Sequence, residues 1–145
     1  MTQGTLLDTN VLIALTQPDH EHYHKAQEWF FGLRKGLWGV CPLTEAGFIR
    51  ITAARSQLPG PIAIQQAIAI LQSMKAYPDF WYWQIDKSWT DLTAPFAGRI
   101  SGHQQIIDAY LLGLAIKENG VLVTFDRAIR YLAGEEFAAH LLVLE

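Results

Sequence analysis

The chain has 145 residues, half of them hydrophobic, and a formal net charge of −3. This length and apolar content suffice for one domain with a buried core and exclude a disordered chain. The acidic balance excludes a surface that binds polyanions by charge alone, and the single cysteine, Cys41, excludes an internal disulfide framework.

The N-terminal region shows no charged segment followed by an apolar one, and no apolar run is long enough to cross a bilayer. We therefore expect a cytoplasmic protein that does not associate with membranes.

Short apolar runs alternate with amphipathic stretches along the chain. The expected strands are residues 5–7, 37–41, 80–85, 121–124 and 141–144. The expected helices are a short one after Asp8, residues 20–34, 42–54, 62–75, a short one after Lys87, 103–118 and a small one after Asp126, with loops at 56–61 and 95–102. This alternation predicts one α/β domain over residues 1–145, with a mainly parallel central sheet of four or five strands flanked by helices on both faces.

Three acidic residues follow expected strands: Asp8, Glu45 and Asp126. Each has an ordinary explanation, because acids cap helices or interact with the helix dipole, and Asp126 has Arg130 four positions later. In a parallel sheet, however, the carboxyl ends of the strands share one edge, where ligands bind. Their shared position predicts a site there.

Asp108 lies on the same helical face as Leu111, Leu112 and Ala115, and no basic residue stands three or four positions away. A carboxylate on a core-directed face needs a compensating partner, which a distant arginine, a backbone amide or a divalent cation can supply. Carboxylates that converge with Asp108 at the sheet edge repel one another unless a cation neutralises them, and an all-oxygen set suits Mg²⁺ or Mn²⁺.

The segments around these acids resemble, in order and spacing, the acidic motifs of PIN-domain nucleases, and most closely those of VapC toxins from bacterial toxin-antitoxin pairs. They read LLDTNVL at residues 6–12, PLTE at 42–45, IDAYL at 107–111 and VTFD at 123–126. The resemblance covers nearly the whole chain and is weakest between residues 56 and 96.

This resemblance implies a metal-dependent endoribonuclease, with Asp8, Glu45 and Asp108 holding Mg²⁺ or Mn²⁺ directly or through water, and Asp126 completing the acidic pocket or assisting a second ion. A metal-activated water would attack the phosphodiester. Asn10 and Thr124 match positions that shape such pockets. The resemblance also implies a homodimer and a VapB-like antitoxin protein as partner, with RNA as the substrate.

Arg50, Arg55 and Arg99 are candidates for contacts with RNA phosphates, although solvated arginines are the ordinary reading of each. His103 stands just before the acidic helix and could approach the site or face solvent. The aromatic and aliphatic residues of the chain are expected to form both the core and the protein interfaces. The sequence alone does not show which of them belong to which.

Three alternatives remain. His20-Glu21-x-x-His24 has the spacing of a helical zinc metallopeptidase motif, but it leaves the four acids unexplained. A phosphotransferase with Asp8 as nucleophile, as in haloacid-dehalogenase-like enzymes, would have a second aspartate where this chain has Asn10. The third alternative is a PIN-like domain that only binds RNA or protein.

Overall fold

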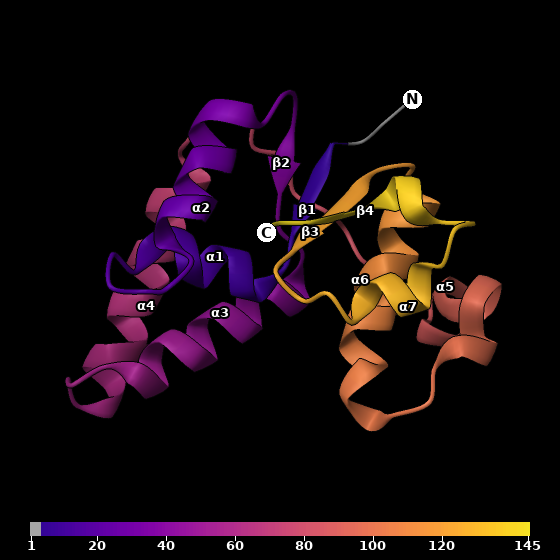
Figure 1. The fold of residues 1–145 in the computed structure, drawn as a ribbon. Coiled ribbons are helices and arrows are strands. Elements are labelled where there is room, and N and C mark those ends of the chain that lie inside the picture. The colour runs from indigo at the N-terminus through magenta and orange to yellow at the C-terminus, as the bar shows by residue number, and fades with distance from the viewer. Residues whose placement is uncertain (1–3) are drawn as a thin grey trace.

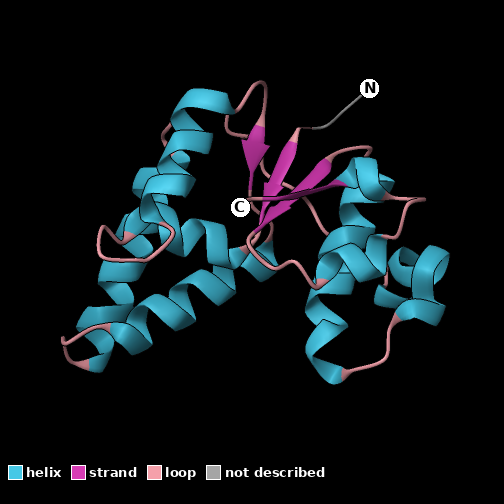
Figure 2. Ribbon diagram, in the orientation of Figure 1, coloured by secondary structure: helices cyan, strands magenta, loops and turns pink. Residues whose placement is uncertain are grey.

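The computed structural model describes residues 4–145, so the first three residues of the expected domain lie outside it. Its centre is a parallel sheet with strand order β2-β1-β3-β4. The strands are β1 (Thr5–Leu7), β2 (Trp38–Gly39), β3 (Val121–Thr124) and β4 (Leu141–Val143). Helices lie on both sides of the sheet (Figures 1 and 2). The expected α/β fold is confirmed, with four strands.

Successive residues of the two central strands enter different halves of the core. Leu7 and Val123 pack in one hydrophobic cluster, whereas Leu6 and Leu122 pack in the other. All four side chains are fully buried. Because side chains alternate across a strand and both faces of this sheet are covered, the strands consist of continuous apolar runs instead of alternating polar and apolar residues.

Residues 80–85, expected as a strand, form an extended segment beside β2 with only one bridge, between Trp38 and Phe80. The backbone amides of Trp81 and Trp83 donate to the carbonyls of Trp38 and Val40 at 2.8 and 2.9 Å. A Cβ atom at Gly39 would overlap the carbonyl oxygen of Trp81. Residues 80–85 can therefore lie this close to β2 only because residue 39 is glycine. They form no regular strand, since β2 itself has only the residues Trp38–Gly39.

One side of the sheet carries α1 (Thr9–Thr16), α2 (Tyr23–Glu28), α3 (Pro42–Arg55) and α4 (Gly60–Lys75). The prediction of one helix over residues 20–34 was wrong, because residues 20–22 form a turn and α2 continues as a π-helical segment, η1 (Trp29–Leu33). In that segment Trp29 and Phe30 are buried while Phe31 is exposed.

The other side carries α5 (Trp89–Thr93), α6 (Ile106–Lys117) and α7 (Ile129–Ala133). Short 3₁₀ segments accompany them: η2 (Ala94–Arg99), η3 (His103–Gln105) and η4 (Ala138–His140). Residues 95–99, the first part of the loop expected at 95–102, are thus helical. Asn119, with φ of 54°, follows α6 in the left-handed conformation that is typical just beyond the end of a helix. Within residues 4–145, no helix has the length and apolar character that crossing a bilayer requires.

Candidate active site

Asp8 lies between β1 and α1 and is attached to both. Its backbone amide donates to the carbonyl of Val123 in β3 at 2.9 Å, which continues the sheet ladder. Its side chain caps α1 by accepting from the amide of Thr9 at 2.7 Å, as the ordinary reading of this residue predicted. The residue is only 7% exposed. Capping does not account for the second carboxylate oxygen, which faces β3.

That second oxygen accepts a hydrogen bond from Thr124 at the end of β3. The Thr124 hydroxyl donates to Asp8 Oδ2 at 2.8 Å and accepts from the Asn10 side-chain amide at 3.2 Å and from the backbone amide of Asp126 at 3.0 Å. Asn10 Oδ1 in turn accepts from the amide of Phe125 at 3.2 Å. One buried hydroxyl therefore fixes the relative positions of Asp8, Asn10 and the turn that carries Asp126.

Asp108, in the first turn of α6, and Asp126, just beyond β3, line the same cavity as Asp8. This acidic cavity has a volume of about 290 Å³ and is lined by Asp8, Thr9, Asn10, Ile13, His20, Ile51, Arg55, Asp108 and Asp126. The sequence analysis predicted that these three acids lie at one edge of the sheet. In the structure all three line one cavity.

The electrostatics of this cavity favour protons or a cation. Burial, then repulsion from Asp8 and Asp126 and a hydrogen bond with Asp126, raise the pKa of Asp108 to about 7. Burial also raises the pKa of Asp8, against the hydrogen bonds from Thr124 and Thr9 that lower it, and the charge of Asp126 adds to the increase. The acids therefore carry an electrostatic penalty that positive charge would relieve.

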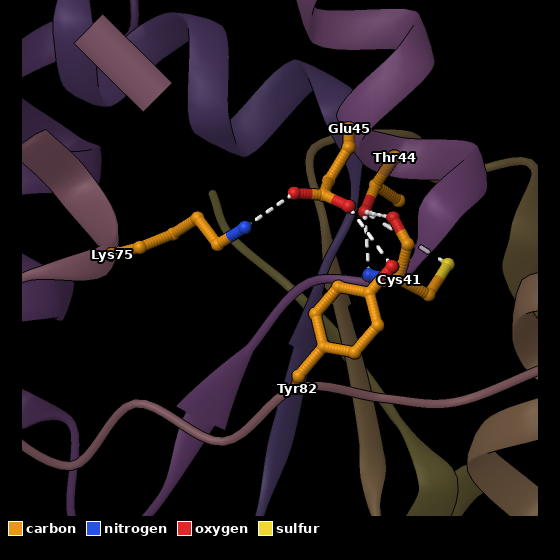
Figure 3. Close-up of polar contacts among 5 residues, drawn as sticks. All are labelled: Cys41, Thr44, Glu45, Lys75 and Tyr82. Carbon is orange, nitrogen blue, oxygen red and sulfur yellow. Dashed lines mark hydrogen bonds and ion pairs between the residues drawn. The ribbon is translucent and has the colours of Figure 1, made fainter. Parts of the chain in front are cut away.

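Glu45, the fourth acid, is not among the residues lining the acidic cavity. Figure 3 shows it on the first turn of α3, approached by Lys75 from α4 and by Tyr82 from the segment beside β2. Lys75 Nζ lies 2.7 Å from Glu45 Oε2, and the Tyr82 hydroxyl donates to Oε1 at 3.0 Å. Burial, followed by the hydrogen bond to Glu45, raises the pKa of Tyr82 to about 12, so the phenol stays protonated as a donor.

Hydrogen bonds between Thr44 and Cys41 fix the start of α3, next to Glu45. The Thr44 hydroxyl donates to the carbonyl of Cys41 at 3.1 Å and accepts from the amide of Cys41 at 3.0 Å, as Figure 3 shows. Cys41 is fully buried, and burial raises the pKa of its thiol. Cys41 is therefore a structural residue.

The side chains fit a hard divalent cation by their chemistry. Asp8, Asp108 and Asp126 supply only carboxylate oxygens, which Mg²⁺ and Mn²⁺ prefer. Within residues 4–145, no three His, Cys, Asp or Glu side chains lie close enough to form a ready-made metal cage. Mg²⁺ keeps several waters and typically uses one or two protein carboxylates, so its binding does not require three such side chains already in place.

The three arginines singled out by sequence have different surroundings. Arg55 lines the acidic cavity, while Arg50 is exposed on the same helix, α3. Arg99 donates to the carbonyls of Leu132 and Ala133 at the end of α7, both at 3.0 Å. Arg99 therefore has a structural role as a helix cap, and only Arg55 is placed beside the acids.

The histidine motif does not form the helical pair that zinc peptidases require. His20 and Glu21 lie in a turn before α2, where His20 Nδ1 accepts from the amide of His22 at 3.0 Å, and His24 is exposed. His103 is also exposed and is not among the residues lining the acidic cavity. Asp126 is not paired with Arg130, which binds Glu145 at 3.0 Å instead.

Sequence reasoning missed Lys75 and Tyr82 as partners of Glu45, and His20 as part of the acidic cavity wall. Lys75 and Tyr82 stand 30 and 37 positions from Glu45, and no local spacing connects them. His20 was visible in the sequence, but its place in the histidine motif suggested a different site.

Residues 5–135 match the PIN domain family, so the chain belongs to the PIN domain family. Among individual relatives, the chain is 38% identical over 124 residues to ribonuclease VapC39 of Mycobacterium tuberculosis, a match that covers 86% of this chain and 89% of the relative. It is also 38% identical over 128 residues to ribonuclease VapC38 of the same species, covering 88% and 89%.

Two solved structures share the fold. The crystal structure of VapBC2 from Rickettsia felis, bound to a DNA fragment from its promoter, superposes with a TM-score of 0.64 at 15% identity and covers 99% of this chain and all of that one. VapC20 of Mycobacterium tuberculosis, a toxin that cleaves the sarcin-ricin loop, gives a TM-score of 0.64 at 11% identity, covering 89% and 93%. At these identities the likeness concerns the fold alone.

Proposed function

We propose that this protein is a Mg²⁺- or Mn²⁺-dependent endoribonuclease and the toxin component of a toxin-antitoxin pair. The observation that carries the proposal is the acidic cavity with Asp8, Asp108 and Asp126, at the carboxyl edge of the sheet of a PIN domain. The similarity to ribonucleases VapC39 and VapC38 over most of both chains supports the choice of RNA as substrate.

In this proposal Asp8 and Asp108 bind the divalent ion, directly or through water, and Asp126 completes the acidic cavity. A bound ion supplies Lewis acidity and lowers the pKa of a coordinated water, which is the chemistry that phosphodiester hydrolysis needs. Thr124 and Asn10 are positioning residues, because their hydrogen bonds fix the oxygens of Asp8 and the turn of Asp126.

Glu45 lies outside the acidic cavity, at the start of α3, where Lys75 and Tyr82 hold its side chain. In the arrangement described here its charge is balanced by the Lys75 ammonium. We propose that Glu45 contributes to the metal site when the ion is bound, as the family resemblance implies, and that Lys75 and Tyr82 set its position.

The RNA is expected to approach along α3. Arg55 lines the acidic cavity and offers its guanidinium to a phosphate, while exposed Arg50 on the same helix adds positive charge nearby. With a net charge of −3, the protein needs such local contacts together with the metal to hold a polyanion.

We propose a VapB-like antitoxin and a second copy of this chain as protein partners, and the cytoplasm as the place of action. The VapBC2 structure supports the type of complex. The described surface exposes large apolar side chains on several elements, among them Phe31, Leu33, Ile62, Ile64 and Tyr131, which two protein interfaces would cover.

The test is cleavage of total cellular RNA by the purified chain, separated from any co-purified partner, with Mg²⁺, Mn²⁺, Zn²⁺ or EDTA. We expect cleavage with Mg²⁺ or Mn²⁺, and its loss with EDTA and in Asp8→Asn and Asp108→Asn. Asp91→Asn, an exposed acid on α5, is the matched control and should retain activity. Binding of RNA and metal without cleavage would instead support a non-catalytic PIN-like domain.

A further inference from the structure

A second cavity, larger than the acidic one, lies beside it. This polar cavity has a volume of about 420 Å³ and is lined by Gln17, Asp19, His20, Thr52, Arg55, Ser56 and Gln66. It shares His20 and Arg55 with the acidic cavity. The loop after α1, the end of α3 and the middle of α4 supply its wall, so three separate segments build one space next to the proposed site of cleavage.

The wall of the polar cavity carries donors and acceptors of several kinds. It combines two side-chain amides, two hydroxyls, an imidazole, a carboxylate and a guanidinium. Arg55 Nη1 and Gln17 Oε1 lie 3.4 Å apart, a long contact that a ligand can replace. Among residues 4–145, the His20 side chain forms a hydrogen bond only through Nδ1, which accepts from the amide of His22.

Thr52 adds an independent observation. Its hydroxyl oxygen is buried and has no hydrogen-bond partner among residues 4–145, although its side chain belongs to the cavity wall. A buried hydroxyl without a partner is unfavourable, so proteins rarely keep one without a reason. A polar ligand that enters the cavity and turns this side chain toward itself would supply the missing hydrogen bond.

We propose that the polar cavity binds a nucleobase of the RNA whose phosphate occupies the acidic cavity, with Arg55 contacting the backbone between the two. This inference rests on the proposed ribonuclease function. Single-stranded RNA is recognised through unstacked bases that hydrogen bond along their edges, and amide and guanidinium groups are the usual readers of those edges. The volume falls within the range of small-molecule sites.

The charges in the cavity favour a base over a second phosphate. Asp19 places a carboxylate in the wall, which repels an anion but accepts hydrogen bonds from the amino and imino groups of a base. Arg55, at the boundary of both cavities, is the cation of the set and lies where the backbone would pass.

The first experiment measures binding of AMP, GMP, CMP and UMP to the whole protein by calorimetric titration, with ribose 5-phosphate as the ligand that lacks a base. We expect at least one nucleotide to bind ten times more tightly than ribose 5-phosphate. Equal affinities for all five ligands would overturn the proposal.

Two variants then locate the bound base. Gln66→Ala and Thr52→Val should each reduce the advantage of the nucleotide over ribose 5-phosphate at least threefold. Gln65→Ala, on the exposed face of α4 and not in the cavity wall, is the matched control and should retain it. Because Thr52→Val removes an unpartnered buried hydroxyl, its melting temperature should not fall, which separates lost binding from lost folding. Unchanged affinities in both variants would place the base elsewhere.

Cleavage of an oligoribonucleotide separates this proposal from the function on which it rests. Gln66→Ala should raise KM more than it lowers kcat and should alter which phosphodiester is cut. A wild-type protein that cleaves RNA, with a cleavage pattern unaffected by both variants, would overturn the nucleobase site and leave the ribonuclease intact. A wild type that binds a nucleotide through Gln66 but cleaves no RNA with any metal would overturn the ribonuclease alone.

Discussion

Lys75 Nζ lies 2.7 Å from Glu45 Oε2 and joins the end of α4 to the first turn of α3, where the family resemblance places a metal ligand. The side chains of Lys75 and Glu45 are exposed by only 23% and 20%. An ammonium of the same chain therefore neutralises this carboxylate in a region of restricted solvent access.

Replacing this lysine tests what the ion pair does. Lys75→Met should lower the free energy of unfolding by about 1–2 kcal/mol, between the values for exposed and fully buried pairs, because Glu45 loses its partner. Mn²⁺ should then raise the melting temperature more in Lys75→Met than in the wild type, since the metal has no competitor for Glu45. Differential scanning calorimetry with and without Mn²⁺ measures both effects.

The matched control is Lys87→Met, which removes an exposed lysine before α5 and should change neither quantity. A double variant, Glu45→Gln with Lys75→Met, should recover part of the lost stability because neither charge is left unpaired. If Mn²⁺ stabilised the wild type and Lys75→Met equally, Glu45 would not be a metal ligand.

The hydroxyl of Thr124 gives a second prediction. Thr124→Val removes the donor to Asp8 Oδ2 and the acceptor for Asn10 and the amide of Asp126. Because the site is buried, we expect a loss of about 1–3 kcal/mol in urea unfolding together with a fall in kcat. Thr124→Ser keeps the hydroxyl and should retain most of the activity; equal losses in both variants would mean that the methyl group matters, not the hydrogen bonds.

The raised pKa of Asp108 makes the metal-free protein pH-dependent. This pKa is 3.8 in an unperturbed chain and about 7 in the folded protein, so between these values the folded state binds more protons than the unfolded state. The contribution of Asp108 to stability should therefore fall as pH rises from about 4 to about 7. Asp108→Asn, which cannot ionise, should lack this contribution.

Urea unfolding in EDTA at pH 5 and pH 8 measures the effect as the difference between wild type and Asp108→Asn. We expect the variant to gain stability relative to the wild type at pH 8, and saturating Mg²⁺ to reverse the order. A difference independent of pH would show that Asp108 ionises normally.

Substitution of two arginines should have opposite effects on stability and on RNA binding. Arg99→Met removes donors from two carbonyls at the end of α7 and should cost about 1–2 kcal/mol of stability with little effect on RNA affinity. Arg55→Met should leave stability within about 0.5 kcal/mol while weakening RNA binding and reducing its salt dependence by about one unit of slope. RNA binding measured at several salt concentrations distinguishes the two, and equal slopes for Arg55→Met and wild type would exclude a phosphate contact.

Sequence patterns predicted the parts of the site that depend on local structure. Asp8 and Asp126 follow buried strands, and Asp108 lies on the core-directed side of a helix, so parallel topology alone brings them to one edge. The structure places all three in one cavity for this reason. The two central strands were likewise visible as uninterrupted apolar runs.

What the sequence could not indicate depends on distant contacts. Glu45 resembles the other acids in its position after a strand, yet its partner Lys75 comes from a different helix. Arg130 stands at helical spacing from Asp126 but binds Glu145, because the chain between them forms a turn before α7 begins. Residues 20–34 have helical periodicity, but a turn held by His20 delays the helix to Tyr23.

The strand order has a consequence for how the protein is made. β1 is first along the chain but lies inside the sheet, between β2 and β3. Asp8 is therefore synthesised early, but the hydroxyl that fixes its carboxylate belongs to Thr124, 116 positions later. No nascent fragment that stops short of β3 contains the assembled acids. An active nuclease should therefore form only after the ribosome has synthesised most of the chain.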